Sequence, residues 1–147
     1  LHTAYRRQRQ MCIRDRLWIE ITERCRDLPI SMIKKTVTAF REAGIHITMD
    51  DYGTGSSSSQ MMLELPVEGI KIDMFFVKDI LEEKKKQALV IGMINFANAA
   101  DLKICIEGIE NDSLESYLRQ FDVTCFQGYH YSRPICQDEL MKLLIKP

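Results

Sequence analysis

The sequence predicts an α/β fold in which about five consecutive strand and helix units build a parallel sheet. Short segments with the alternating pattern of strands are followed by longer segments with the apolar periodicity of helices. A polar, chemically capable residue ends every predicted strand, as is typical of parallel sheets that carry an active site at their carboxyl edge. The chain has 147 residues, of which 46% are hydrophobic, so it can bury the core that this fold needs.

The first sixteen residues stand apart from this pattern. They are crowded with Arg and Gln and show neither helical nor strand periodicity. The run from Met11 to Arg16 also resembles a translated sequencing adapter, with a basic linker or a natural arm as the alternatives. We therefore expect residues 1–16 to be a non-native or linker-like segment, and the domain to occupy residues 17–147.

The first predicted unit begins with a largely buried strand over residues 17–21, which carries Glu20 near its end. A helix follows, with Ile30, Ile33, Val37 and Phe40 on one face and Gly44 as its stop signal. The next strand covers residues 45–49, where apolar and polar residues alternate.

Two adjacent carboxylates, Asp50 and Asp51, end this second strand. Neighbouring strand residues normally point to opposite faces, so a shared site for both requires a backbone turn, which Gly53 and Gly55 would allow. Adjacent carboxylates also repel each other unless a cation lies between them, which makes a metal site the first hypothesis. An ordinary acidic turn is the alternative, because Asp, Gly and Ser are common loop formers.

The remaining units follow the same order. A short helix is predicted over 61–65 and a strand over 69–73, which carries Lys71 and Asp73. A long helix from about Glu82 should bury a face formed by Leu89, Met93, Phe96, Ala97 and Ala100, with the lysines at 84–86 in solvent. The last predicted elements are a strand over 102–106 ending at Glu107, a helix over 111–120, a strand over 123–126 ending at Gln127, and a helix over 137–145.

The residues at the strand ends should meet at one edge of the sheet, because all strands of a parallel sheet end on the same side. Most of them are oxygen donors, which predicts a carboxylate metal site. They are Glu20, Asp50, Asp51, Lys71, Asp73, Glu107 and Gln127.

Composition narrows the function. A net charge of -1 gives no electrostatic case for a DNA or RNA polymer. The five cysteines form no C-x-x-C pair, which fits a reducing compartment and mostly buried packing roles, and the three histidines are scattered without the spacing of a zinc site. No membrane span or signal peptide is visible, so we expect a cytoplasmic protein, although its parent could be anchored through an upstream region.

Five motifs, in order and at matching spacing from Leu17 onward, resemble the C-terminal part of an EAL domain, the cyclic di-GMP phosphodiesterase family. The motifs are Glu20-Ile21-Thr22-Glu23, Asp50-Asp51-Tyr52-Gly53-Thr54-Gly55, Lys71-Ile72-Asp73, Glu107-Gly108-Ile109-Glu110 and Gln127-Gly128-Tyr129. The resemblance implies a (β/α)8 barrel of the TIM type, which needs roughly 250 residues. This chain would supply strands four to eight and lack the first three, including a Glu-x-Leu strand and a metal-binding Asn.

The resemblance also assigns a two-metal site for Mg²⁺ or Mn²⁺. Glu20 and Asp50 resemble ligands of one metal, and Asp50 would bridge to a second metal held by Asp51 and Glu107. Oxygen ligands suit these ions, and two metals can activate a bridging water and clamp a scissile phosphate.

Four further residues receive roles from the resemblance. Lys71 would hydrogen-bond and help activate the attacking water, while Asp73 and Gln127 would position water, metal or substrate. Because Lys71 would face several carboxylates, it should stay protonated and act by orientation rather than as a base. Glu23 would anchor the Asp-Asp-Tyr-Gly loop.

The implied reaction is hydrolysis of cyclic di-GMP to linear pGpG by the complete protein. An inactive EAL module that binds the nucleotide or serves as a scaffold is the alternative, and a barrel acting on another phosphate or enolisable substrate is more distant. Homodimerisation and upstream sensory or GGDEF-type domains are further implications. The chain alone should be a poor catalyst of low stability, because an unclosed barrel exposes strand edges and lacks some metal-site residues.

Overall fold

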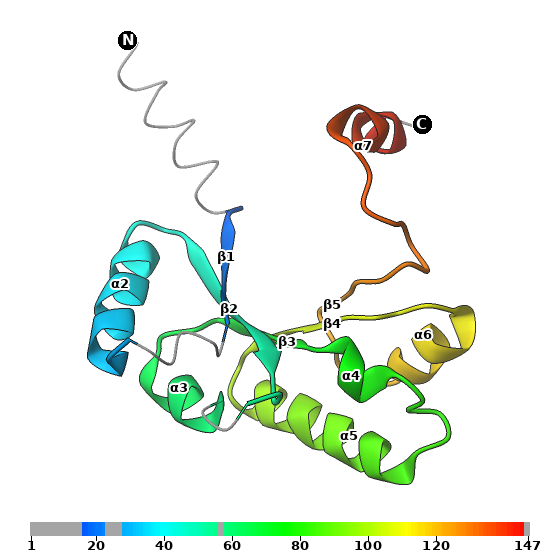
Figure 1. Ribbon diagram of the computed structural model, residues 1–147, viewed down its shortest axis with the longest axis horizontal. Helices are drawn as coiled ribbons and strands as arrows, with labels where there is room; N and C mark the ends of the chain where they lie inside the picture. The colour runs from blue at the N-terminus through cyan, green and yellow to red at the C-terminus, as the bar shows by residue number, and fades with distance from the viewer. Residues whose placement is uncertain (1–15, 23–27, 56–57, 146–147) are drawn as a thin grey trace.

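The computed structural model describes residues 16–22, 28–55 and 58–145 (Figure 1). Within these ranges the strands form one five-stranded sheet in the order β1-β2-β3-β4-β5, and every pair of neighbours is parallel. The strands are β1 (Trp18–Thr22), β2 (His46–Tyr52), β3 (Gly69–Ile72), β4 (Lys103–Ile106) and β5 (Cys125–Phe126). The predicted α/β fold of consecutive parallel units is therefore confirmed.

Helices separate the strands along the chain. They are α2 (Ile30–Glu42), α3 (Ser58–Glu64), α4 (Met74–Val77), α5 (Lys84–Ala99), α6 (Asp112–Leu118) and α7 (Gln137–Leu144). No helix in the described ranges is long and apolar enough to span a lipid bilayer. In Figure 1, α7 stands away from the sheet at the end of an extended segment, and none of its residues is buried.

The two faces of the sheet differ in chemistry because side chains alternate along each strand. One set, formed by Met49, Ile70, Ile72, Ile104 and Ile106, is almost fully buried and belongs to the hydrophobic core. The other set includes Thr48 and Lys71, which are the buried polar residues of the described chain. The apolar set packs the sheet against its helices, and the alternating set is left to form a polar face.

Helix α5 buries a face that matches the predicted one only in part, at Met93 and Ala97. Val90, Met93, Ile94 and Ala97 are its buried residues. Leu89 and Phe96 were predicted to be buried but are 47% and 41% exposed. Apolar residues lie on several sides of this helix, so their periodicity does not identify a single buried face. The face that is buried is decided by packing against the sheet. Phe96 instead stacks on Tyr52 with ring centroids 6.2 Å apart.

Helix α4 is an element that the sequence analysis missed, because its four residues are too few to show periodicity. Asp73 begins it as the N-cap, and its Oδ1 accepts a hydrogen bond from Phe75 N at 2.7 Å. Phe76 and Val77 of α4 are buried in the core. The helix therefore fixes the segment that leaves the carboxyl end of β3.

Candidate functional site

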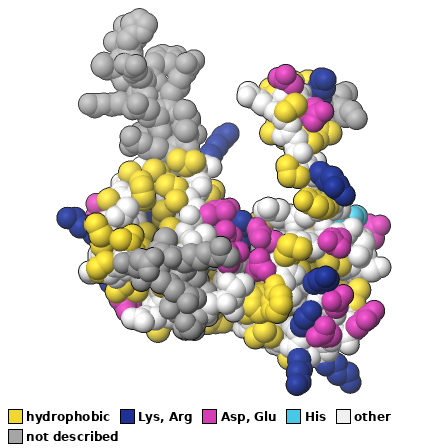
Figure 2. All heavy atoms as spheres, viewed as in Figure 1, with side chains coloured by type: hydrophobic (Ala, Val, Ile, Leu, Met, Phe, Trp, Pro, Cys, Tyr) yellow, Lys and Arg dark blue, Asp and Glu magenta, His cyan; other side chains and the backbone are white. Residues whose placement is uncertain are grey.

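A buried lysine stands at the centre of the carboxyl edge of the sheet, which we call the rim. Lys71 in β3 is only 7% exposed, and its Nζ forms ion pairs with three carboxylates from other strand ends. The partners are Glu107 Oε1 at 2.6 Å, Glu20 Oε1 at 3.0 Å and Asp50 Oδ1 at 3.2 Å. We call these four residues the rim cluster. Figure 2 shows acidic side chains gathered in the middle of this view.

Strand register brings the members of the rim cluster together. Glu20 lies in β1 and Asp50 in β2, so both approach Lys71 from neighbouring strands on one side. Glu107 follows β4 on the other side, and its backbone N–H donates to Ile72 O at 3.0 Å, which extends the pairing of β3 with β4. Gly108 comes next with φ of 77°, and a Cβ there would collide with Met74. The chain therefore turns sharply just after it delivers Glu107.

An irregularity in β2 interrupts the strand at the two adjacent carboxylates. Thr48 and Met49 pair in regular register with β3, but the register shifts before Tyr52, so Asp50 and Asp51 together oppose one residue of β3. Asp51 has a φ of 54°, in the left-handed region. The predicted backbone turn exists, and Gly53 takes part in it with a φ of 93°, but it begins two residues earlier as a bulge inside the strand.

The rim cluster holds more negative than positive charge. Three carboxylates face one ammonium group, which leaves an excess of two negative charges if all are ionised. Burial alone would lower the pKa of Lys71, but its bonds to Glu107 and Glu20 and its contact with Asp50 raise that pKa well above the usual range. Lys71 is therefore a fixed cation at neutral pH.

Asp50 has one oxygen whose bonding is incomplete. Its Oδ1 is buried and accepts no hydrogen bond from the described residues. This atom lies 3.2 Å from Lys71 Nζ, close enough for electrostatic attraction but without the orientation of a hydrogen bond. The Lys71 ammonium offsets part of the cost of burying this oxygen, which can still accept a further donor or cation.

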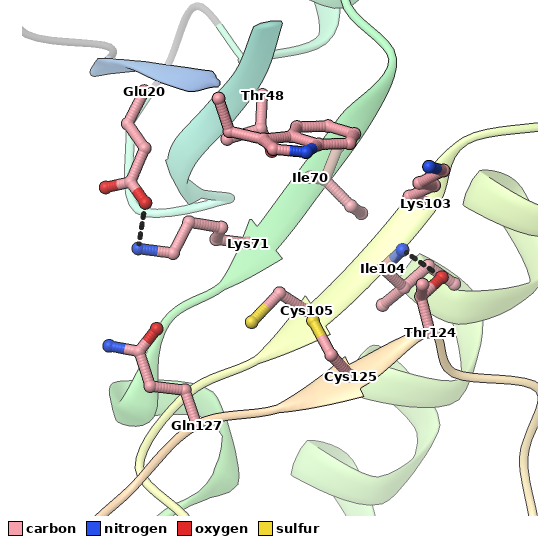
Figure 3. A pocket seen from close by; sticks show the side chains of 11 residues that line it. Glu20, Thr48, Ile70, Lys71, Lys103, Ile104, Cys105, Thr124, Cys125 and Gln127 are labelled. Carbon is pink, nitrogen blue, oxygen red and sulfur yellow. Dashed lines mark hydrogen bonds and ion pairs between the residues drawn. The ribbon is translucent and has the colours of Figure 1, made fainter. Parts of the chain in front are cut away.

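The other predicted site residues are not members of the rim cluster. Gln127 follows β5 and lines a cavity of about 350 Å³ that Glu20 and Lys71 also line (Figure 3). Asp73 lies one residue beyond β3, where its carboxylate caps α4. Asp51 is half-buried within the bulge of β2. Glu23, the predicted loop anchor, lies outside the described residues.

Two cysteines in this cavity were not recognised from the sequence as part of the site. Cys105 and Cys125 are direct partners in the register of β4 and β5, and both line the cavity (Figure 3). Burial and the neighbouring Cys125 raise the pKa of Cys105 to about 12, which keeps its thiol neutral at physiological pH. The expectation of mostly buried cysteines is wrong for the described ones, because Cys125 and Cys136 are exposed.

Comparison with known proteins gives a consistent family match. The family model described as "EAL domain" matches residues 3–134. The cyclic di-GMP phosphodiesterase NbdA of Pseudomonas aeruginosa is 31% identical over 119 residues, which cover 81% of this chain and 15% of NbdA. The curated relatives with the best matches are far longer, since the chain spans only 15% to 20% of their lengths.

Solved structures extend the match to three dimensions. The PaMucR phosphodiesterase in a c-di-GMP complex superposes with a TM-score of 0.79 at 26% identity, covering 86% of this chain and 51% of that one. The manganese and cy-diGMP complex of BlrP1 from Klebsiella pneumoniae gives 0.75 at 29% identity, covering 82% and 31%. The sheet described above therefore corresponds to part of a larger barrel.

Proposed function

Because this chain belongs to the EAL domain family, we propose that its rim cluster serves the metal-dependent hydrolysis of cyclic di-GMP to linear pGpG in the complete protein. The observation that carries the proposal is the convergence of three carboxylates on one buried lysine at the carboxyl ends of parallel strands. Active sites of parallel α/β sheets lie at this edge.

The rim cluster fits a divalent metal by charge and by donor chemistry. Its carboxylates carry two more negative charges than Lys71 balances, and carboxylate oxygens are ligands that suit Mg²⁺ or Mn²⁺. The buried Oδ1 of Asp50 is an acceptor that lacks a hydrogen-bond donor. We assign Glu20, Asp50, Asp51 and Glu107 as metal ligands, with Asp50 shared between two ions. Bound metal would supply an activated water and neutralise charge on the phosphate.

The fixed charge of Lys71 sets its part in the reaction. Because three carboxylates face Lys71 and raise its pKa, we assign it an orienting role rather than that of a base. It can donate hydrogen bonds to the attacking water and stabilise the charge that develops on the phosphate. Its contacts with Glu20 and Glu107 hold the ammonium in place before substrate arrives.

Gln127 and Asp73 complete the proposed site at its margins. The Gln127 carboxamide shares the cavity with Lys71 and can donate to or accept from a nucleotide. Asp73 would contribute its charge to positioning of water or substrate, in addition to capping α4. Glu23 as the loop anchor, a cytoplasmic location, a homodimer and upstream sensory or GGDEF-type domains belong to the same proposal and rest on family membership.

The test is a comparison of two purified proteins, this chain and a longer protein that supplies the preceding strands of the barrel. Both are assayed for cyclic di-GMP turnover with Mg²⁺ or Mn²⁺ and for nucleotide binding by calorimetry. We expect metal-dependent formation of pGpG by the longer protein and little turnover by this chain. Binding without turnover in the longer protein would contradict the proposal and favour the inactive binding module.

A further inference from the structure

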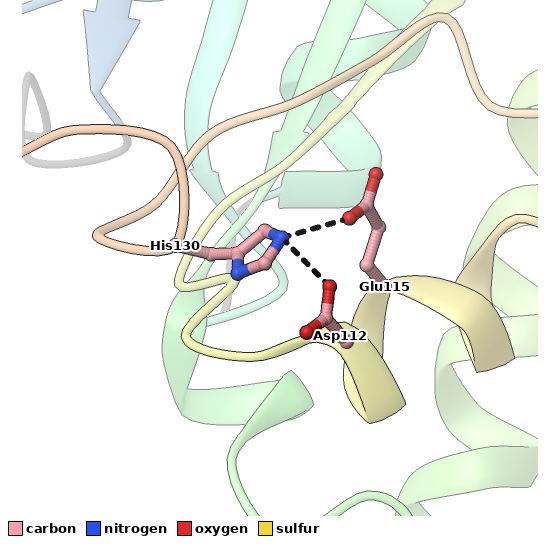
Figure 4. A group of neighbouring side chains, drawn as sticks. All are labelled: Asp112, Glu115 and His130. Carbon is pink, nitrogen blue, oxygen red and sulfur yellow. Dashed lines mark ion pairs between the residues drawn. The ribbon is translucent and has the colours of Figure 1, made fainter.

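A second cluster of metal-ligand side chains lies between α6 and the segment that follows β5. His130 Nε2 lies 3.0 Å from Glu115 Oε2 and 3.5 Å from Asp112 Oδ1. One ligand atom from each of the three residues lies within 4.8 Å of the other two. Figure 4 shows the three side chains pointing toward one another. We call Asp112, Glu115 and His130 the flank cluster; it shares no residue with the rim cluster.

Backbone hydrogen bonds hold the two segments of the flank cluster in place. Ile109 N donates to Gln127 O at 3.1 Å, and His130 N donates to Ile109 O at 3.0 Å. Gly128 lies so close to the Ile109 backbone that a Cβ would not fit between them. Asn111 caps α6 by accepting from Leu114 N at 2.9 Å. The three side chains therefore project from fixed backbone positions.

The bonding around Glu115 orients one of its oxygens toward the cluster. Arg119 Nε donates to Glu115 Oε1 at 2.7 Å, while Oε2 faces His130. Metal-ligating carboxylates commonly have their second oxygen held by a hydrogen-bond donor in this way. Asp112 is 94% exposed at its side chain, and its one contact given by the structure is the distant pair with His130. It can therefore move toward a cation without losing another partner.

We propose that the flank cluster is a divalent-cation site of the zinc class. Ligands about 2.0–2.1 Å from Zn²⁺ in a tetrahedron lie roughly 3.4 Å apart, close to the separations of His130 from the two carboxylates. One imidazole and two carboxylates form a mixed N/O donor set, which suits Zn²⁺ better than Mg²⁺. The two carboxylates balance the ion's charge, and the exposed side of Asp112 leaves a position for water.

The proposed site lies close in sequence to Gln127, which lines the cavity beside the rim cluster. A bound cation would tie α6 to the segment that carries Gln127, three residues before His130. The same three side chains also satisfy a simpler arrangement, in which a protonated His130 forms ion pairs with both carboxylates. Only the first arrangement predicts that the flank cluster binds added zinc, so one experiment separates the two.

The experiment titrates Zn²⁺ into the full chain by calorimetry, with excess Mg²⁺ present to occupy the all-oxygen rim and with thiols first blocked by iodoacetamide. We expect one zinc ion per chain. Asp112→Asn and His130→Gln should each weaken zinc binding by about tenfold or more, the size of effect seen when the surroundings of a metal ligand are altered. Asp138→Asn, another exposed acid in the first turn of a helix, is the matched control and should bind zinc normally.

Two further measurements make the result decisive. Asp50→Asn should retain zinc binding, so failure of the proposed rim chemistry would leave this proposal intact. In NMR spectra, saturating zinc should shift the His130 ring resonances of the starting protein but not those of Asp112→Asn at the same zinc concentration. If zinc affinity is unchanged in both Asp112→Asn and His130→Gln, and zinc leaves the His130 ring resonances unmoved, the site is overturned in favour of the ion-pair arrangement.

Discussion

The two ends of the sheet both carry charged clusters, but the numbers of acidic and basic residues in them are reversed. At the amino ends of the strands, Glu68 pairs with Arg41 at 2.6 Å and with His46 at 2.7 Å. At the carboxyl ends, Lys71 serves three carboxylates. We call Arg41, His46 and Glu68 the base cluster. One acid with two basic partners does not need a metal cation to balance its charge. Three acids with one basic partner carry negative charge that a metal cation can balance.

This difference supports the proposal that the rim cluster binds a ligand and that the base cluster is structural. In the base cluster both oxygens of Glu68 have their own partner, and His46 is further fixed by stacking on Trp18 with ring centroids 4.6 Å apart. In the rim cluster a buried oxygen of Asp50 stays without a hydrogen-bond donor. Buried polar atoms are normally satisfied, so this oxygen at the carboxyl edge of a parallel sheet is consistent with the proposed metal site.

The largest effect should come from Asp50→Asn, which keeps the side-chain volume but removes a negative charge from the rim cluster. In the longer protein with a complete barrel, we expect turnover of cyclic di-GMP to fall by roughly a thousandfold, or about 4 kcal/mol of transition-state stabilisation. Calorimetry should show weaker Mn²⁺ binding. Glu68→Gln in the base cluster is the control for a charge change elsewhere, and comparable losses in both variants would erase the proposed difference between the ends.

Lys71→Met tests the same contrast through stability. The variant leaves three carboxylates facing one another without a cation, and we expect the free energy of unfolding to fall by about 3 kcal/mol. This estimate is at the low end for a buried pair because Glu20 is half exposed to water. In urea titrations, Mn²⁺ should restore more stability to Lys71→Met than to the starting protein. Lys84→Met, at an exposed lysine, should show neither effect; equal stabilisation of all three proteins by Mn²⁺ would argue against a cation site here.

Substitutions of Asp73 can separate two roles of this residue, the capping of α4 and the contribution of its negative charge to the rim. Asn is as good an N-cap as Asp, so Asp73→Asn should unfold normally, while Asp73→Ala should lose about 1 kcal/mol in urea titrations. If the charge of Asp73 also positions water or substrate, Asp73→Asn will reduce turnover in the complete barrel despite its normal stability. Full activity in Asp73→Asn would reduce this residue to its structural role.

Glu68→Gln should cost about 1 kcal/mol of stability, because it weakens two partly exposed ion pairs but leaves an acceptor oxygen in place. Turnover should stay unchanged, since the base cluster lies at the opposite end of the strands from Lys71. Urea unfolding and the cyclic di-GMP assay on the same preparation provide both values. A large loss of turnover would show that the base cluster influences the rim.

The smallest expected effect is that the contribution of Lys71 to stability does not change with pH near neutrality. The folded-state pKa of Lys71 is raised, so its contribution to stability is fully present below the unfolded value of about 10.4 and is lost only as pH rises through the folded value. The stability difference between the starting protein and Lys71→Met should therefore be constant from pH 7 to 9. A difference that shrinks over this range would mean that Lys71 loses its proton there and can act as a base.

The sequence predicted the strand ends well because alternation marks each strand locally, and because all strands of a parallel sheet end on the same side. Glu20, Lys71 and Glu107 were placed at one rim from position alone, and the structure joins them by ion pairs. Their chemical roles remain predictions. The turn after β2 was predicted at Gly53, which does have a positive φ, but the bulge at Asp51 was not predicted because a left-handed backbone at a non-glycine residue leaves no signal in the sequence.

Features that depend on contacts between distant segments could not be predicted in this way. His130 looked isolated in the sequence, yet it lies beside Asp112 and Glu115 because backbone bonds dock the segment after β5 against Ile109. Cys105 and Cys125 face each other only through the register of β4 and β5. The buried face of α5 was likewise decided by the sheet, since apolar residues lie on several sides of that helix.

The order of the strands also has a consequence for how the chain folds during synthesis. Each strand pairs with the strand that precedes it in the sequence, so every unit can add to a sheet edge that already exists when it leaves the ribosome. Paired residues of neighbouring strands are 20 to 34 positions apart, so each closure involves one strand and helix unit rather than the whole chain. β5 has two residues and is added last, so Gln127 would reach the rim only after the other strands are paired. Pulse-labelled hydrogen exchange should therefore find the amides of β4 protected before those of β5.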